Sequence, residues 1–244
     1  MTHPAESTHW YDKDGKPAYE VKAANGNMRP TTLRDARKFG YFPSVTTIIR
    51  LAAAPGLERW KQQQVLHAAL TLPKIDGEAE DAYLDRIMQD AQEQGKKAAQ
   101  RGTDIHAALE GGSIDGEYGL HVMGAAKALD DAFGGRVWTY EKSFAHPAGF
   151  GGKVDANCDI AIIDYKTTEK PLDGIKTWPE HAWQLSAYRE GLQMPQARCA
   201  IVYVSVTEPG QAKVIELAED ELKQGWECFQ ALLAFHQAKT GYKP

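Results

Sequence analysis

The chain has 244 residues and a formal net charge of −5, and its residues are 43% hydrophobic and 25% charged. This length suffices for one substantial globular domain. The lack of an apolar run of roughly 20 residues argues against a membrane span, and the N-terminus lacks the apolar core of a signal peptide. Three scattered cysteines exclude a four-thiolate metal or iron–sulfur site, and we expect a cytoplasmic protein without membrane association. The negative net charge argues against a protein that coats nucleic acid generally, but it does not exclude a local basic channel.

The first half of the chain predicts a small hairpin followed by helices. HWYDKDGKPAYEV, residues 9–21, indicates a hairpin that turns at Asp14-Gly15. Ser44 is placed to cap a helix that Pro55-Gly56 ends, and a second helix restarts at residue 57. Residues 78–100 predict a charged, peripheral helix, Thr103 is placed to cap a separate short helix that Gly111-Gly112 ends, and residues 119–133 predict one more.

The second half changes to a strand pattern with two interspersed helices. Strands are predicted over residues 136–144, 150–158, 160–168, 199–207 and 212–217, and helices over residues 178–192 and 219–238. This order predicts an α/β (α+β) fold with an N-terminal helical region. We divide the chain into an N-terminal hairpin and extension (1–42), a helical region (43–135) and a core (136–244), the last two forming one compact unit.

The stretch IAIIDYKTT, residues 160–168, passes from a fully apolar segment directly into an acid and a lysine. Asp-x-Lys alone is a common pattern, but residues i and i+2 of a strand share one face, so Asp164 and Lys166 project together. A two-residue turn at Asp159-Ile160 would place Asp155 opposite Asp164, with their Cβ atoms roughly 4.5–5.5 Å apart. Two facing carboxylates repel each other unless something positive lies between them, and a divalent cation or the Lys166 ammonium would serve. The alternative is two strand-end acids that point separately into water.

This strand pair and four further short motifs together resemble a known superfamily. GGKVD (151–155) and IIDYKTT (162–168) resemble the core of the PD-(D/E)XK nucleases. RGTDIH (101–106) and QLSAY (184–188) are similar to the Gly-Thr-x-x-His and Gln-x-x-x-Tyr elements of the RecB-like exonuclease branch, and PSVTTII with LERWK (43–61) is similar to its phage-type and mitochondrial genome-maintenance members. The matches cover residues 43–192, and their order and spacing are jointly specific.

The resemblance implies a restriction-endonuclease-like core, in which a central mixed β-sheet is flanked by helices, and a divalent cation, Mg²⁺ or Mn²⁺. The implied metal ligands are His106, Asp155, Asp164 and the backbone carbonyl of Tyr165. The implied catalytic residues are Lys166, Asp164, Asp155 and Glu141, and the implied substrate-binding residues are Gln184, Tyr188, Arg101 and Thr103. Two alternatives stay open: His106 can interact with Glu110 one turn on, and Gln184 with Tyr188 can form an ordinary packing face.

The function implied is that of a metal-dependent DNA exonuclease acting on single-stranded or duplex ends, in phage or prophage recombination, repair or DNA degradation. A recombination or single-strand-binding protein is the partner expected. A structure-specific or site-specific endonuclease of the same fold, and a catalytically silent nucleic-acid-binding accessory protein, are the alternatives. Neither an iron–sulfur cluster nor a nucleotide cofactor is expected, because the cysteines are too few and the chain contains no Gly-x-x-x-x-Gly-Lys-Ser/Thr phosphate loop.

Overall fold

The computed structural model describes residues 9–52 and 55–244. Residues 1–8 of the predicted N-terminal extension therefore lie outside the described part of the chain. None of the helices in the described residues is long and apolar enough to cross a bilayer.

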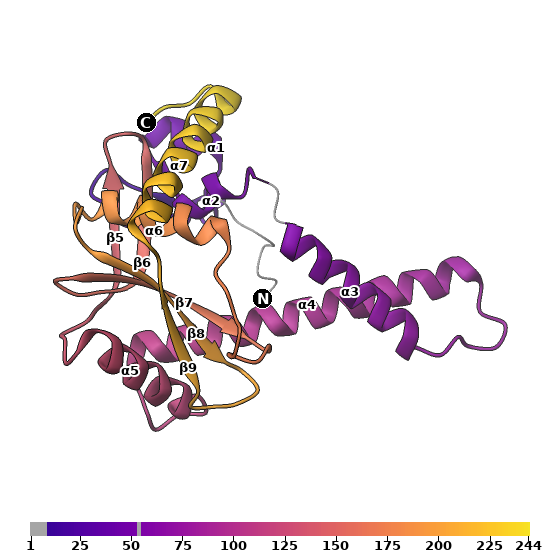
Figure 1. Ribbon diagram of the computed structural model, residues 1–244. Helices are drawn as coiled ribbons and strands as arrows, with labels where there is room; N and C mark the ends of the chain where they lie inside the picture. The colour runs from indigo at the N-terminus through magenta and orange to yellow at the C-terminus, as the bar shows by residue number, and fades with distance from the viewer. Residues whose placement is uncertain (1–8, 53–54) are drawn as a thin grey trace.

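A five-stranded mixed sheet forms the centre of the fold (Figure 1). Its strands, in spatial order, are β5 (Thr139–His146), β6 (Phe150–Asn157), β7 (Ala161–Thr168), β8 (Arg198–Ser205) and β9 (Ala212–Glu216). Neighbouring strands are antiparallel except for β7 and β8, which are parallel because α6 (Pro179–Gly191) crosses over between them. This is the mixed α/β architecture that the sequence predicted.

Helices cover both faces of the sheet. On one face α6 and α7 (Glu219–Thr240) bury an apolar core that includes Phe150, Ile162, Leu185, Ile201 and Phe229. On the other face α5 (Gly119–Phe133) and the C-terminal part of α4 (Glu80–Gly111) bury Ile105, Leu129, Ile163, Tyr165 and Val202. Successive residues of β7 and β8 point to opposite faces, and both faces are covered, which explains why these two strands read as continuous apolar runs.

The N-terminal elements form two small sheets and two short helices. The two sheets pair β1 (Trp10–Tyr11) with β4 (Phe42–Pro43) and β2 (Glu20–Lys22) with β3 (Met28–Pro30), and α1 (Leu33–Phe39) and α2 (Val45–Ile49) accompany them. The predicted turn is present at Asp14-Gly15, where Gly15 has φ +78°. The two sides of the predicted hairpin are joined by the Ala18 amide, which donates to the Trp10 carbonyl at 2.8 Å, and by an antiparallel bridge between Tyr11 and Pro17. Trp10 and Tyr11 also pair with residues 42–43, and β2 pairs with β3. Ser44 caps α2 as predicted.

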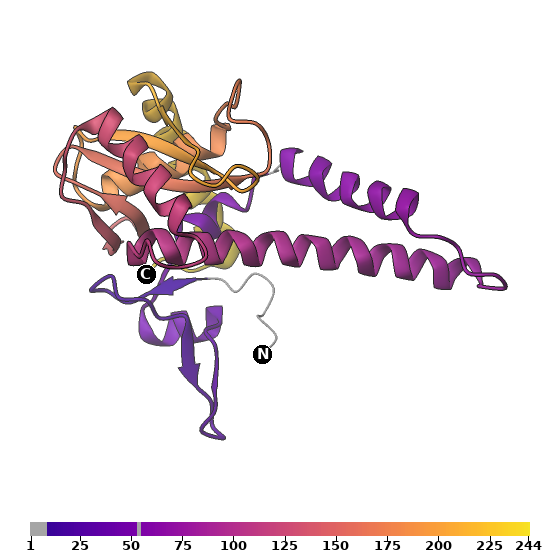
Figure 2. The same cartoon turned by 90° about the horizontal axis from the view of Figure 1, so that it is seen from below.

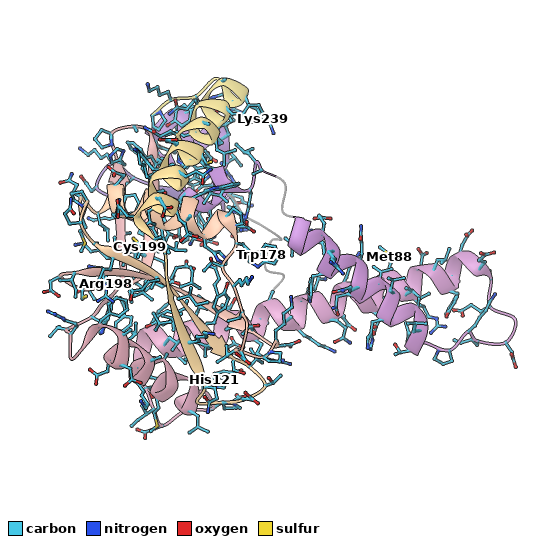
Figure 3. All side chains as sticks on the ribbon, viewed as in Figure 1. Met88, His121, Trp178, Arg198, Cys199 and Lys239 are labelled. Atoms are coloured by element: carbon cyan, nitrogen blue, oxygen red, sulfur yellow. The ribbon has the colours of Figure 1, made fainter. Side chains whose placement is uncertain are left out.

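A helical arm formed by α3 (Pro55–Thr71) and the first two thirds of α4 projects from the body (Figures 1 and 2). Exposed Met88 lies on this projecting part (Figure 3). Two predictions were wrong here. Pro55 does not end a helix but begins α3, because the first turn of a helix leaves the backbone N–H without an intrahelical partner and the missing N–H of proline costs nothing there. Residues 80–111 form one helix instead of two. Thr103 caps no helix, since its hydroxyl donates to the Ala99 carbonyl at 3.1 Å within α4.

Candidate active site

The hairpin of β6 and β7 determines how Asp155 and Asp164 lie. Its register pairs Ala156 with Ile163 and Asn157 with Ile162, and the Cys158 amide donates to the Ala161 carbonyl at 2.9 Å, which leaves two turn residues. Continued by one position, this register sets Asp155 opposite Asp164. The predicted two-residue turn and register are confirmed at these pairs, but regular pairing does not extend to Asp155 and Asp164.

The two strands separate at the aspartates. Regular pairing ends at Ala156, and the backbone amide of Tyr165 donates to Oδ2 of Asp155 at 2.8 Å. On the other side of β6, the pairing with β5 skips the position of Glu141 and Asp155, and Glu141 has φ +58°. The Asp155 carboxylate thus replaces a backbone acceptor between the strands and is held there.

Asp164 is buried, with 1% of its surface exposed. Its Oδ1 accepts a hydrogen bond from Nε2 of Gln184 at 2.5 Å, and its Oδ2 forms an ion pair with the ammonium of Lys166. Among the described residues, however, Oδ2 has no hydrogen-bond donor of suitable geometry. The alternative of two acids pointing separately into water is therefore wrong, because one is fully buried and the other is bound by a backbone amide.

The buried charges perturb one another. Burial, and next the charge of Asp164, raise the pKa of Asp155 to about 7, although Lys166 acts in the opposite direction. Burial alone would lower the pKa of Lys166, but the carboxylates of Asp164 and Asp155 outweigh it and the pKa is raised. Lys166 is therefore an ammonium at neutral pH, and the site holds one positive group for two facing acids.

His106 reaches the site from α4. A Cβ at Gly102 would lie 3.3 Å from Oγ1 of Thr167, so the glycine allows α4 to approach the end of β7 closely. One turn further on, Nδ1 of His106 lies 3.7 Å from Oδ2 of Asp155. Burial, followed by the charge of Lys166, lowers the pKa of His106. The imidazole is therefore neutral at neutral pH, which is the form that can bind a metal ion.

Gln184 and Tyr188 lie on one face of α6, as their spacing predicts. Nε2 of Gln184 donates both to Asp164 and to the Tyr188 hydroxyl, the latter at 3.0 Å. Burial raises the pKa of Tyr188 well above its usual value, and the charges of Asp164 and Asp155 raise it further, so this hydroxyl keeps its proton. The pair thus contacts the carboxylate cluster directly. Leu185, on another face of the same helix, is fully buried in the core.

Three predicted residues are engaged away from the aspartates. The Glu141 carboxylate pairs with the ammonium of Lys153 on the neighbouring strand. Arg101 pairs with Glu169 at 3.0 Å, both side chains being well exposed, and Thr103 bonds within its own helix. The sequence shows only that these three residues lie within or next to the motifs. Their side-chain partners lie on another strand, in the segment after β7, or one helix turn away.

The donor set fits a hydrated divalent cation better than a closed metal cage. Within the described residues, no group of three or more His, Cys, Asp and Glu side chains is arranged to hold a metal ion. Mg²⁺ typically takes only one or two carboxylates and keeps water and phosphate oxygens as its other ligands. Asp155 and Asp164 supply two such carboxylates, and Oδ2 of Asp164 is at present ion-paired with Lys166.

Sequence reasoning missed three residues that lie beside this site. His9, Tyr11 and Tyr19 were treated only as parts of a hairpin. In the structure the ring of Tyr11 covers Gly151 of β6, and a Cβ at Gly151 would lie 2.9 Å from Cβ of Tyr11. The aromatic spacing of HWYDKDGKPAY was a visible signal, but its contact with β6 depends on the tertiary fold.

The chain is similar to three solved structures at low identity. The alkaline exonuclease LHK-Exo from Laribacter hongkongensis is 19% identical, with 76% of this chain and 95% of that chain covered and a TM-score of 0.41. LHK-Exo in complex with dAMP is 17% identical, with 81% of this chain and 88% of that chain covered and a TM-score of 0.42. SSO0001 is 15% identical, with 72% of this chain and 86% of that chain covered and a TM-score of 0.31. No family model and no curated protein matches the chain. Likenesses this distant assign no function, so the function is inferred from the site.

Proposed function

We propose that the protein is a metal-dependent DNA exonuclease that hydrolyses phosphodiester bonds at DNA ends with Mg²⁺ or Mn²⁺. The observation that carries the proposal is a pair of acids beside the Lys166 ammonium: Asp164 is buried, and Asp155 is held by the Tyr165 amide where the two strands separate. Two acids and one ammonium leave the pair short of positive charge. A divalent cation would supply it.

Asp155, Asp164 and the carbonyl of Tyr165 would hold the cation, and neutral His106 adds a nitrogen ligand that Mn²⁺ accepts. When bound, such an ion stabilises charge on the scissile phosphate and lowers the pKa of an attacking water. These are the two requirements of phosphodiester hydrolysis at neutral pH.

The protein itself orients the carboxylates. The Tyr165 amide fixes Asp155, and the Gln184 amide fixes one oxygen of Asp164, whose other oxygen forms the ion pair with Lys166. Tyr188 in turn accepts from Gln184, and its hydroxyl keeps its proton. Partners of this kind hold ligand side chains in a productive orientation before substrate arrives.

Lys166 supplies the positive group next to the reacting phosphate. Its raised pKa keeps it charged, so it offsets phosphate charge and orients the attacking water, while release of its proton is disfavoured. Lys166 therefore acts mainly through electrostatic stabilisation.

DNA as substrate is supported by the ordered motifs between residues 43 and 192 that resemble RecB-like exonucleases. The arm of α3 and α4 begins beside the end of β7, where Gly102 approaches Thr167 and Arg101 pairs with Glu169. This arm forms a wall next to the site that favours an entering strand end over continuous duplex. The setting we propose is phage or prophage recombination, repair or DNA degradation in the cytoplasm, with a recombination or single-strand-binding protein as partner.

End-labelled linear DNA and closed circular DNA, each incubated with Mg²⁺, Mn²⁺ or EDTA, test the proposal. We expect cleavage of linear DNA only, loss of cleavage in EDTA, and no cleavage by Asp164→Ala. Asp159→Asn, in the exposed turn of the same hairpin, is the matched control and should cleave normally. Cleavage of circles would identify an endonuclease instead, and binding of DNA without any hydrolysis would identify an accessory protein.

A further inference from the structure

An aromatic cluster from the N-terminal segment lies against the catalytic strand. The rings of His9 and Tyr19 stack with their centroids 4.4 Å apart, and the hydroxyls of Tyr11 and Tyr19 are 2.9 Å apart. Tyr11 is buried, but His9 and Tyr19 are each partly exposed. The core clusters do not include this stacked pair. A stacked, partly exposed aromatic pair outside the core is available to a ligand.

Backbone contacts attach this cluster rigidly to β6. The Ser44 amide donates to the His9 carbonyl at 2.9 Å, and Ser44 also forms a parallel bridge with Gly151. Trp10 and Tyr11 pair with residues 42–43 in the same arrangement. The segment that carries His9 is therefore linked through one intervening strand to the strand that carries Asp155.

The cluster is also continuous with the carboxylate site. Tyr11 packs on Gly151, and a Cβ at the next residue, Gly152, would lie 3.1 Å from Cε1 of Tyr188. Tyr188 accepts from Gln184, which donates to Asp164. Burial mainly, and then the neighbouring Tyr19 and Tyr188, raise the pKa of Tyr11, so its hydroxyl stays protonated. A polar and aromatic path thus leads from Tyr19 to the aspartates.

Two cations accompany the aromatic pair. Arg50 ends the short helix that Ser44 begins, and Lys153 lies two residues beyond Gly151 on β6. Burial first, and then the charges of Arg50 and Lys153, lower the pKa of His9, so its ring is neutral at neutral pH. Lys153 is partly neutralised by Glu141. Exposed Arg50 forms no ion pair within the described residues and is the freer of the two charges.

We propose that His9, Tyr19, Arg50 and Lys153 form a subsite for one unpaired nucleotide of the DNA strand, with the base against the aromatic pair and the phosphate toward the cations. The subsite rests on the proposed function, and it flanks Asp155 and Asp164 on the side of β6 that faces the N-terminal segment. Aromatic rings bind any base through its π-face, and cations follow the backbone. The subsite therefore binds an unpaired end without reading its sequence.

Fluorescence anisotropy with a labelled dT12 strand in EDTA tests the subsite without any cleavage. Removing a stacking ring costs on the order of 1–3 kcal/mol per base, so Tyr19→Leu should weaken binding by about tenfold or more. Tyr19→Phe keeps the ring and should bind like the wild type. Arg50→Gln, at an exposed position, should weaken binding and reduce the salt slope by about 0.7, the value for one phosphate contact on a single strand.

An abasic strand of the same length separates stacking from phosphate binding. The wild type should prefer dT12 to the abasic strand, whereas Tyr19→Leu should bind the two equally. Phe39→Leu, an exposed aromatic on α1 away from β6, should leave dT12 affinity unchanged, and a melting curve checks the fold of each variant.

Failure of the subsite is distinguishable from failure of the enzyme. If the wild type cleaves linear DNA while Tyr19→Leu and Arg50→Gln bind dT12 with wild-type affinity and salt slope, the subsite is wrong and the nuclease proposal stands. If the wild type neither binds dT12 nor cleaves linear DNA, both are wrong. An Arg50→Gln effect without any loss of base preference in Tyr19→Leu also contradicts the stacking role.

Discussion

Asp155→Asn should stabilise the metal-free protein while abolishing cleavage. Burial and the facing Asp164 raise the pKa of Asp155 from 3.8 to about 7. At roughly 1.4 kcal/mol per unit, ionised Asp155 costs the folded state about 4 kcal/mol. Asparagine removes the charge, and its Oδ1 can still accept from the Tyr165 amide.

The direction of the pKa shift of Asp155 determines how the stability of the protein depends on pH. The folded pKa lies above the unfolded value, so the folded state binds the proton more tightly and loses stability as pH rises from about 4 through about 7. The variant's advantage should be nearly complete at pH 8 and under about 2 kcal/mol at pH 5. For a chain of this size, 4 kcal/mol corresponds to a melting temperature about 8 °C higher, or more.

Thermal melts in EDTA at pH 8 and pH 5 measure this difference. Adding Mn²⁺ should raise the melting temperature of the wild type, because a ligand bound only by the folded state stabilises it, and should do little for Asp155→Asn. Asp159→Asn, in the turn between the same strands and paired at the surface with Arg136 at 3.2 Å, should shift stability by less than about 0.5 kcal/mol. Equal melting temperatures of wild type and Asp155→Asn at pH 8 would refute the argument that the two aspartates are strained without a cation.

Three further predictions concern the site and its support. Lys166→Gln should suppress cleavage while Mn²⁺ still raises the melting temperature; loss of that rise would reassign Lys166 to a structural role. Burial and then Lys166 lower the pKa of His181 to about 4, so the unfolded state binds its proton more readily and stability falls as pH drops from about 6.5 to 4. Urea unfolding in EDTA should show His181→Asn gaining about 3 kcal/mol on the wild type between pH 7 and pH 4, and parallel pH profiles would contradict this. A Cβ at Gly225 would lie 2.6 Å from backbone atoms of Ala182, so Gly225→Ala should lower the free energy of unfolding by about 1–3 kcal/mol, whereas Gly116→Ala, with nothing within 4 Å, should be neutral.

The amino-acid sequence by itself determined the parts of the site that are close along the chain. Asp155 and Asp164 flank a two-residue turn, and a turn that short leaves the hairpin one register, so their opposition followed from spacing. Asp164 with Lys166, and Gln184 with Tyr188, share a face through strand and helix periodicity. The order of helical and strand patterns along the chain likewise predicted the α/β fold.

Only the tertiary structure decided the contacts between distant segments. Glu141 pairs with Lys153, and Tyr11 lies on Gly151, because β5, β6 and the N-terminal segment meet in space, and no local pattern encodes which side chains then face each other. The helix through Thr103 continues because Gly102 packs against the end of β7, a contact that outweighs the local tendency of Gly-Thr to begin a new helix. Short-range geometry is set by backbone periodicity and turn length, whereas long-range partners are chosen by the packing of the whole chain.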